Sequence, residues 1–429
     1  MSNIDLKKYE EALQYRPDTI KNLFPDSKAL IVSGKYVHEA ILRKERTGKK
    51  CLTIAANGRN PWVIEGTLRA AAKTNSVVLI EIAKSEGNYC PVNFDNIAKY
   101  VNDICEKNDL KVVVGIHADH YAIKNDKDCE IALTEIPAMI KSGITSVAID
   151  ASHLEPQDNV FTNVKLAKLI PSWVSLETEV GEIKGDQGLS TVEDAVFHIA
   201  ALNSRGIFPT WIALNNGSVH GLEATGGGIN VELTAEVHEA IQKYGVYGAQ
   251  HGTSGNNYDK LRNIAQKTNT SKANVATALQ MISWGIKVNE AGNAVLDENK
   301  NFIKLEDKGV SAEAWKYMVD LANEKGWKGG DYKKLNLLIQ KRLEEQSPEI
   351  QARMAGDVEE FVANLLKNVF SADGTANYAL DAILETKSQE INHFNKIIED
   401  SNTWTDEYIK VEGKKLFEVQ EVVEGNFDD

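Results

Sequence analysis

Eight short apolar runs, spaced at nearly regular intervals, constrain the fold of this chain more than any other feature. They occupy residues 51–56, 77–83, 112–116, 145–150, 174–180, 210–214, 246–250 and 284–288. Successive runs begin about 26 to 38 residues apart, the length of a strand, a helix and two loops. Segments between them, such as Pro61–Lys73 and Ser271–Ser283, have helical periodicity. This pattern predicts an α/β fold, a closed (β/α)8 TIM barrel, with an open doubly wound sheet as the alternative.

The strand-like runs cease from Leu296 onward. Residues 311–325, 333–345, 348–371 and 375–400 have the pattern of helices, and the chain ends in an acidic tail. We therefore expect three parts. These are an N-terminal lead-in over residues 1–28, a catalytic barrel over residues 29–295, and an extended helical C-terminal segment over residues 296–429 that packs on the barrel or on a partner subunit.

The composition excludes several classes of partner. A net charge of −14 argues against nucleic acid, because proteins that bind it usually present a basic face. No apolar run approaches the roughly 20 residues of a membrane span, and the N-terminus lacks the apolar region of a signal peptide. The four cysteines show no Cys-x-x-Cys spacing, which indicates reduced thiols. We therefore expect a cytoplasmic protein that binds neither nucleic acid nor membranes.

Titratable side chains gather where the predicted strands end, which is where barrel enzymes carry their catalytic groups. They are His117, Asp119 and His120 after the third run, Glu177, Glu179 and Glu182 at the fifth, His220 after the sixth and His251 after the seventh. A buried strand that ends in such groups is costly unless they are hydrogen-bonded or hold a metal. Together, His120, His220 and His251 predict a three-imidazole site with an open fourth position, typical of catalytic zinc. Core or capping histidines are the alternative for each one alone.

Small residues follow two of the predicted histidine ligands. Gly221 comes directly after His220, and Gly252, Ser254 and Gly255 follow His251. Such a turn exposes backbone amides that can bind a phosphate, and barrels often bind phosphate at the loops after strands 7 and 8. A tight turn without a ligand is the alternative.

The order of these motifs resembles that of class II fructose-bisphosphate aldolases, the zinc-dependent barrel enzymes of the ketose-bisphosphate aldolase group. The motifs are His-x-Asp-His, Leu-Glu-x-Glu-x-Gly, Val-His-Gly, His-Gly-x-Ser-Gly and Lys-x-Asn. The resemblance covers roughly residues 29–295, with a weaker similarity near 348–370. It implies reversible aldol cleavage of a ketose bisphosphate, above all fructose 1,6-bisphosphate, to dihydroxyacetone phosphate and an aldehyde such as glyceraldehyde 3-phosphate.

The resemblance also implies a role for individual residues. His120, His220 and His251 match the zinc ligands, Glu179 matches the carboxylate that shares or borders the metal site, and Asp119 matches the acid/base at the C4 oxygen. Gly221, Gly252 and Ser254 match the phosphate loop, often assisted by Na⁺ or K⁺, and Asn289 matches a strand-8 asparagine that touches substrate hydroxyls. Arg353 matches an arginine that reaches across a homodimer to the second phosphate, with a surface ion pair as the alternative.

Three stretches depart from the family pattern and indicate a divergent branch. The family carries Gly-Gly-Glu-Glu-Asp after strand 5, whereas here Glu182 or Asp186 would have to protonate C3. The loop after Asn289 lacks the usual Asp-Thr. The stretch Asn57–Glu65, whose Asn57 we expect at the substrate site, resembles the companion subunits of tagatose-bisphosphate aldolases.

Four other functions stay open from the sequence. The chain could cleave another phosphorylated ketose, such as tagatose bisphosphate, or be a non-catalytic partner subunit of such an aldolase. A Schiff-base aldolase would use a strand-end lysine, for which Lys287 is placed. A metal-dependent hydrolase would activate water, but the first strand ends Ala55-Ala56-Asn57 without the His-x-His that such barrels often carry.

Overall fold

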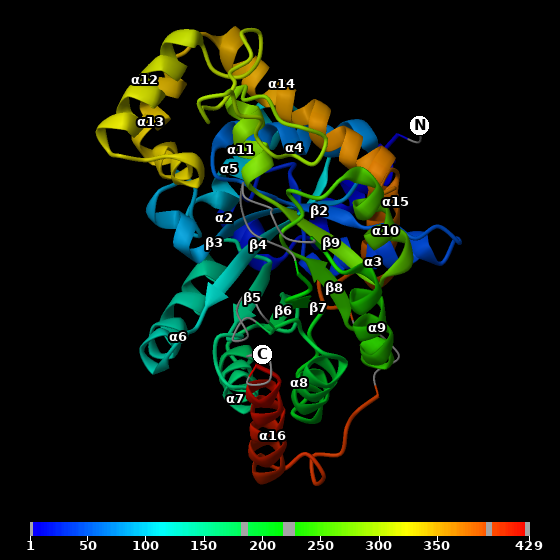
Figure 1. The fold of residues 1–429 in the computed structure, drawn as a ribbon. Helices are drawn as coiled ribbons and strands as arrows, with labels where there is room; N and C mark the ends of the chain where they lie inside the picture. The colour runs from blue at the N-terminus through cyan, green and yellow to red at the C-terminus, as the bar shows by residue number, and fades with distance from the viewer. Residues whose placement is uncertain (1–2, 182–187, 218–227, 392–396, 425–429) are drawn as a thin grey trace.

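The computed structural model describes residues 3–181, 188–217, 228–391 and 397–424, and a closed barrel of parallel strands lies at its centre (Figure 1). The ring runs β4-β3-β2-β9-β8-β7-β6-β5, and β5 pairs with β4 to close it. The strands are β2 (Thr53–Asn57), β3 (Val78–Ala83), β4 (Val113–Ala122), β5 (Ser146–Asp150), β6 (Ser175–Val180), β7 (Trp211–Leu214), β8 (Tyr247–Gln250) and β9 (Thr270–Val275). The predicted TIM barrel is confirmed.

A helix follows every barrel strand and covers the outer face of the ring. The helices are α4 (Pro61–Thr74), α5 (Ile97–Lys107), α6 (Asp126–Lys141), α7 (Pro156–Ala167), α8 (Val192–Ser204), α9 (Val231–Ile241), α10 (Tyr258–Lys267) and α11 (Thr277–Trp284), with short turns η2 (Lys84–Asn88) and η4 (Gln242–Tyr244). Many of them begin at a side chain that accepts a hydrogen bond from the amide three residues later. These capping residues are Asn60, Asn125, Thr191, Asn230 and Asn257. The sequence thus sets where these loops end and the helices begin.

The N-terminal part closes the end of the barrel at which the strands start. It comprises α1 (Leu6–Ala12), η1 (Leu13–Tyr15), α2 (Asp18–Leu23), β1 (Leu30–Ile31) and α3 (Gly34–Glu45). β1 pairs in parallel with the first residues of β4. A buried apolar cluster joins Tyr36 and Val37 of α3 to strand residues Leu79, Val113 and Trp211. The opposite end, where the strands finish, is therefore where the polar side chains gather.

The eighth barrel strand is β9, so the predicted strand at 284–288 is wrong. β9 pairs with β2 on one side and β8 on the other, and the predicted helix Ser271–Ser283 is instead this strand followed by α11. Residues 284–288 follow α11, and Ile286 and Val288 make only isolated antiparallel bridges. The apolar signal was misleading because β9 carries buried polar residues, including Lys272, whereas Trp284 and Ile286 pack in a separate apolar cluster.

The C-terminal segment packs on the barrel over much of its length. It comprises α12 (Ala312–Glu324), η5 (Gly329–Lys334), α13 (Leu335–Glu344), α14 (Pro348–Asn364), the π-helical turn η6 (Leu365–Val369), α15 (Thr375–Thr386) and α16 (Asp406–Glu424). α14 packs on α4, α15 on α3, and α16 on α7 and α8 (Figure 1). The helix predicted at 375–400 ends at Thr386, and α16 was not predicted.

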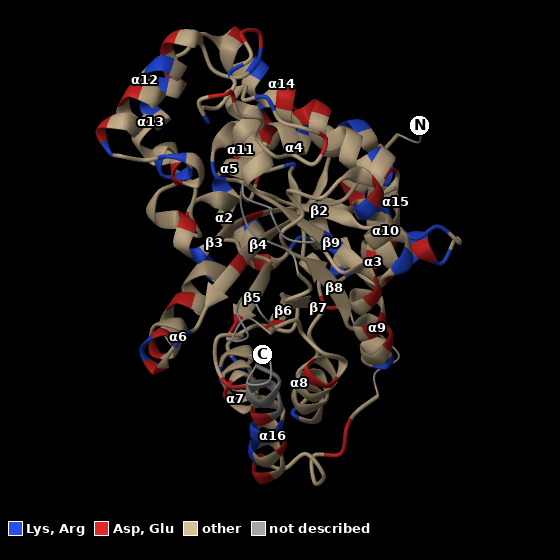
Figure 2. Cartoon of the chain, in the orientation of Figure 1, with Lys and Arg blue, Asp and Glu red and all other residues tan. Residues whose placement is uncertain are grey.

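Basic and acidic residues are interspersed along the outer helices (Figure 2). The four cysteines are buried and free. Among the described helices, none has the length and apolar character that crossing a bilayer requires.

Candidate metal centre and substrate cavity

The end of β4 places two consecutive side chains, Asp119 and His120, at the mouth of the barrel. In a regular strand, successive side chains point to opposite faces. Here the register between β4 and β5 shifts between Ala118 and Tyr121, and His120 has a left-handed φ of 42°. A bulge of this kind inserts a residue and re-aims a side chain. The irregularity therefore lets both Asp119 and His120 line the same cavity.

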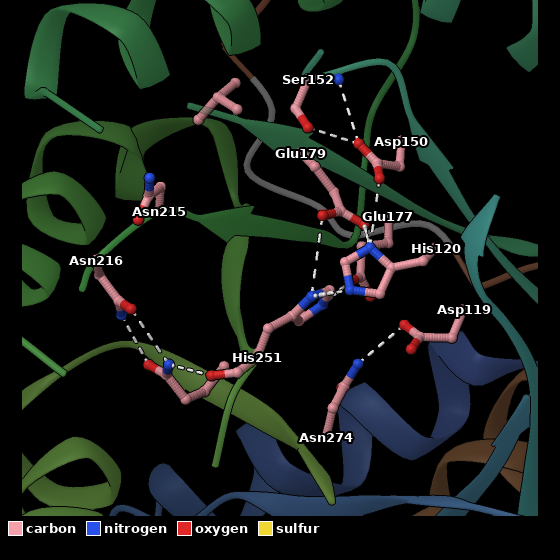
Figure 3. Close-up of polar contacts among 12 residues, drawn as sticks. Asp119, His120, Asp150, Ser152, Glu177, Glu179, Asn215, Asn216, His251 and Asn274 are labelled. Atoms are coloured by element: carbon pink, nitrogen blue, oxygen red, sulfur yellow. Dashed lines mark hydrogen bonds and ion pairs between the residues drawn. The ribbon is translucent and has the colours of Figure 1, made fainter. Parts of the chain in front are cut away.

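The imidazoles of His120 and His251 face each other at this mouth, with His120 Nε2 and His251 Nδ1 2.9 Å apart (Figure 3). A carboxylate lies at the other nitrogen of each ring. Glu177 Oε1 is 2.9 Å from His251 Nε2, and Glu179 Oε1 is 3.1 Å from His120 Nδ1. Carboxylates in these positions favour the tautomers whose protons point toward them. The two facing nitrogens then present lone pairs to each other, an arrangement that a cation would stabilise.

The carboxylates around His120 favour a positive charge on its imidazole ring. Burial opposes a charge on the ring, but the carboxylates of Glu179 and Asp119 outweigh it and raise the pKa of His120 well above its ordinary value. Asp150 Oδ2 lies 3.3 Å from His120 Nδ1. Burial would raise the pKa of Asp150, but the nearby His120 ring and the Ser152 hydroxyl, which donates to Oδ1 at 2.6 Å, lower it.

The described residues offer a donor set that fits a divalent metal. His120 and His251 group with Asp119, and His120 also groups with Asp150 and Glu179, each set having candidate ligand atoms within 4.8 Å of one another. Imidazole nitrogens combined with a carboxylate oxygen are typical zinc ligands. The third imidazole that the sequence predicts, His220, lies outside the described residues, as do Gly221, Glu182 and Asp186.

A buried ionic layer lies two residues deeper in the barrel. Lys272 Nζ is 2.6 Å from Glu177 Oε2 and 2.9 Å from His117 Nε2. Burial would raise the pKa of Glu177, but Lys272 and the neighbouring imidazoles lower it well below its ordinary value. Burial and the charge of Lys272 together lower the pKa of His117, whose Nδ1 forms a hydrogen bond with Ser146 Oγ. Glu177 thus stays ionised and orients the ring of His251.

Two residues of the site, Lys272 and Asn274, were not predicted because the apolar pattern placed the eighth strand at 284–288 instead of on β9. Lys-x-Asn occurs both at 272–274 and at 287–289, and of these two only the stretch at 272–274 lies on a barrel strand. Asn274 Nδ2 donates to Asp119 Oδ1 at 2.9 Å (Figure 3). Asn289 instead accepts backbone hydrogen bonds within its own turn and does not line the cavity. Its strand-8 assignment is therefore wrong, and Lys287 likewise lies off the barrel strands.

Asp119 opens onto a cavity of about 600 Å³ at the end of the barrel. Burial would raise the pKa of Asp119, but His120 and His251 lower it, so the carboxylate is ionised. With Asn274 holding one oxygen, Asp119 can accept a proton from a ligand oxygen beside the two imidazoles.

Groups suited to anions also line this cavity. Gly252 and Ser254 come from the loop after β8, where Gly252 has a left-handed φ of 60°. A turn of this kind can expose backbone amides to a phosphate. Lys84, Lys124 and Lys333 also line the cavity, and Lys333 belongs to η5 of the C-terminal segment.

Two further predicted residues occupy different environments. Asn57 lines the cavity, and its Nδ2 donates to Glu86 Oε2 at 2.5 Å. Arg353 does not line the cavity, because its guanidinium donates to the carbonyl oxygens of Gly309 at 2.8 Å and Val310 at 3.3 Å. Within this chain, Arg353 therefore holds the segment between α11 and α12 against α14.

The chain is similar to known proteins in sequence and in structure. The sequence model of the family described as "Fructose-bisphosphate aldolase class-II" matches residues 39–326. Fructose-bisphosphate aldolase of Streptococcus pneumoniae serotype 4 is 27% identical over 243 residues, covering 53% of this chain and 75% of that protein. The YdjI aldolase of Escherichia coli K12 has a TM-score of 0.53 at 16% identity, covering 81% of this chain and 99% of that one. Fructose-bisphosphate aldolase of Campylobacter jejuni has a TM-score of 0.53 at 18% identity, covering 80% of this chain and 96% of that one.

Proposed function

Since this chain belongs to the class II fructose-bisphosphate aldolase family and is therefore a lyase, we propose that it cleaves a ketose bisphosphate reversibly and depends on zinc. The proposed substrate is fructose 1,6-bisphosphate, and the products are dihydroxyacetone phosphate and glyceraldehyde 3-phosphate. Tagatose 1,6-bisphosphate is the alternative substrate. The observation that carries the proposal is the pair of facing imidazole nitrogens, 2.9 Å apart, beside the carboxylate of Asp119.

His120 and His251 would hold the zinc ion, with His220 as the proposed third ligand and Glu179 beside the site. When bound, zinc supplies a Lewis acid that stabilises negative charge on the oxygens of the ketone half of the substrate. Glu177, oriented by Lys272, keeps the His251 ring in place. The protein thus fixes both imidazoles before substrate arrives.

Asp119 would take the proton from the C4 hydroxyl during cleavage and return it during condensation. Its ionised carboxylate and the hydrogen bond from Asn274 support this role. Glu182 remains our candidate for the proton at C3.

The anion-binding groups of the cavity would hold the two phosphates. We assign one phosphate to the loop with Gly221, Gly252 and Ser254, assisted by Na⁺ or K⁺, and the other to the lysines that line the cavity. Lys333 would contact that phosphate from within the chain. Arg353, whose guanidinium here donates to Gly309, stays our proposal for the residue that reaches the second phosphate of a partner subunit in the homodimer. We extend the proposal to a cytoplasmic homodimer.

A retro-aldol assay with and without chelator tests the proposal. Fructose 1,6-bisphosphate, tagatose 1,6-bisphosphate and fructose 1-phosphate are offered to the zinc-loaded protein, and triose phosphate release is followed. We expect cleavage of a bisphosphate that is lost with chelator and restored by zinc. Chelator-resistant activity that borohydride inactivates in the presence of substrate would point to a Schiff-base lysine. Zinc-loaded protein that cleaves none of them would point to a non-catalytic partner subunit.

A further inference from the structure

Glu81 on β3 is a buried carboxyl group to which the proposed mechanism gives no role. Its side chain lies at the cavity, in the same group of candidate ligand atoms as Asp119 and His117, all within 4.8 Å of one another. Neither Glu81 oxygen has a hydrogen-bond partner among the described residues. The nearest cation, Lys272, is 3.8 Å from Glu81 and only 2.6 Å from Glu177, so Glu177 is its principal partner.

A buried carboxyl group without a partner is destabilising, and such groups are rare unless a ligand or water completes them. Burial and the charge of Asp119 raise the pKa of Glu81 well above its ordinary value. A protonated carboxyl group both donates and accepts one hydrogen bond, which suits a hydroxyl group. A phosphate would be repelled by the neighbouring Asp119 carboxylate. A neutral hydroxyl oxygen of a ligand would satisfy this group without meeting that repulsion.

We propose that Glu81 is a further substrate-binding residue, which hydrogen-bonds the hydroxyl group next to the carbonyl carbon in the aldehyde half of the substrate. This inference rests on the proposed aldol reaction. Asp119 contacts the aldehyde oxygen in that reaction, and Glu81 lies within 4.8 Å of Asp119, so it reaches a substituent of the adjacent carbon. The oxygens of the ketone half lie toward His120 and His251, which do not share a ligand group with Glu81.

Glu81 would thereby make the enzyme selective among aldehydes. A site built to hydrogen-bond a hydroxyl group discriminates strongly against the analogue that lacks it, because the buried polar group is then left without a partner. The enzyme should therefore prefer an aldehyde with a hydroxyl group beside its carbonyl to the corresponding deoxy aldehyde.

Condensation of dihydroxyacetone phosphate with two aldehydes tests this role. The aldehydes are glyceraldehyde 3-phosphate and its analogue without the 2-hydroxyl group. Wild type should prefer the first. Glu81→Leu should lower kcat/KM for glyceraldehyde 3-phosphate by roughly tenfold to a hundredfold. Its kcat/KM for the analogue without the 2-hydroxyl group should stay within about threefold of the wild-type value. Glu81→Gln, which keeps hydrogen-bonding atoms at the same place, should keep the wild-type preference within about threefold.

Three controls separate binding from folding and from metal loss. Zinc content and the exchange of dihydroxyacetone phosphate protons with solvent should be unchanged in Glu81→Leu, since neither involves the aldehyde. Glu39→Leu alters a buried carboxyl group outside the cavity, paired with Arg43 and Arg46, and should not change the preference. If Glu81→Leu does not fold, Glu81→Asp, which withdraws the carboxyl group by one methylene, should lower the preference instead.

If folded Glu81→Leu, or its substitute Glu81→Asp, lowers kcat/KM equally for both aldehydes or for neither, the role of Glu81 is overturned. The aldol function would then stay intact. A wild-type protein that is loaded with zinc but catalyses neither condensation nor proton exchange would overturn the aldol function, and the role of Glu81 with it.

Discussion

Asp119 is the residue on which the proposed proton transfer depends. It has an ionised carboxylate in a buried place, held by Asn274 and stabilised by two imidazoles. Its position beside His120 results from a strand bulge rather than from regular alternation. A catalytic base with this geometry can act on an oxygen bound next to the metal without changing the metal ligands.

Replacing Asp119 with asparagine should lower kcat for cleavage by roughly 10²- to 10⁴-fold, the range of general acid–base catalysis. The variant keeps the size of the side chain and its hydrogen bond with Asn274 but cannot accept the proton. Steady-state kinetics with parallel zinc analysis measures the effect. Full turnover in a variant that has kept its zinc would contradict the assigned role.

Lys272 should be a structural residue whose loss is costly. In Lys272→Met, Glu177 would be left as an uncompensated buried charge, which typically destabilises a protein by about 3–5 kcal/mol. Denaturant unfolding of the metal-free protein measures the change. The matched control is Lys287→Met, at the exposed lysine of the Lys-x-Asn stretch 287–289, where we expect a change within about 0.5 kcal/mol. Equal stabilities for the two variants would contradict the buried ion pair.

At the scale of elements, η5 brings a residue of the C-terminal segment to the cavity of the barrel. It carries two consecutive lysines in different environments. Lys333 lines the cavity, whereas Lys334 pairs with Asp331 at 2.7 Å. Buried side-chain contacts of Asn336 with Asn60 and Gln280 hold the following helix, α13, against the barrel. The segment is thus positioned to contribute to substrate specificity.

Lys333→Ala should raise KM for a ketose bisphosphate by roughly tenfold, because it removes a charge-assisted hydrogen bond to one phosphate. The effect on a ketose 1-phosphate should be smaller than threefold if Lys333 contacts the phosphate of the aldehyde half. Lys334→Ala is the matched control and should change neither KM value. If the two variants change KM for the ketose bisphosphate equally, Lys333 does not contact the phosphate.

The covering helix α8 carries a buried histidine that links stability to pH. Burial lowers the pKa of His198 to about 3, and its Nε2 lies 2.7 Å from Thr178 Oγ1. In the unfolded chain, histidine binds a proton below about pH 6.5, whereas folded His198 stays neutral until about pH 3. The contribution of neutral His198 to the free energy of unfolding is therefore fully present above pH 6.5. It decreases as the pH falls toward 3, by up to about 1.4 kcal/mol per pH unit.

His198→Gln should flatten that decrease, since glutamine does not titrate. Free energies of unfolding of the metal-free protein, measured between pH 6.5 and 4.5, should fall less steeply for the variant than for wild type. Parallel pH profiles would contradict the neutral buried state of His198.

At the scale of the whole molecule, the candidate metal site joins distant parts of the chain. His120 lies at the end of β4 and His251 at the end of β8, on strands that are not neighbours in the ring. A metal held by both would bind the folded chain and not the unfolded one. Binding should therefore contribute directly to global stability.

Free zinc at a hundredfold excess over its Kd should raise the free energy of unfolding by about 2.7 kcal/mol. Thermal unfolding with zinc or with chelator measures the shift. In His251→Ala most of this zinc-dependent shift should be lost, because the imidazole of His251 is one of the proposed metal ligands. A wild-type unfolding midpoint that does not respond to zinc would contradict a metal site at these residues.

The sequence by itself determined the barrel, because the spacing and the apolar content of the eight runs are local properties of the chain. Eight evenly spaced strand-and-helix units leave few ways to bury the apolar residues of the strands. It also determined that His120, Asp119, Glu179 and His251 belong at strand ends, where parallel topology gathers them at one rim. Prediction was wrong at β9 because Lys272 is buried by pairing with Glu177, a partner 95 residues earlier that no local pattern reveals.

The tertiary structure alone decided four features of the site. It placed Asp119 and His120 in one cavity through a bulge, oriented two imidazoles through carboxylates from β6, and brought Lys333 to the cavity from the C-terminal segment. It also left Glu81 without a hydrogen-bond partner in the described residues. The physical reason is shared by all of them. Tautomer, burial and pairing depend on which residues meet in space, and these residues meet only after the ring has closed.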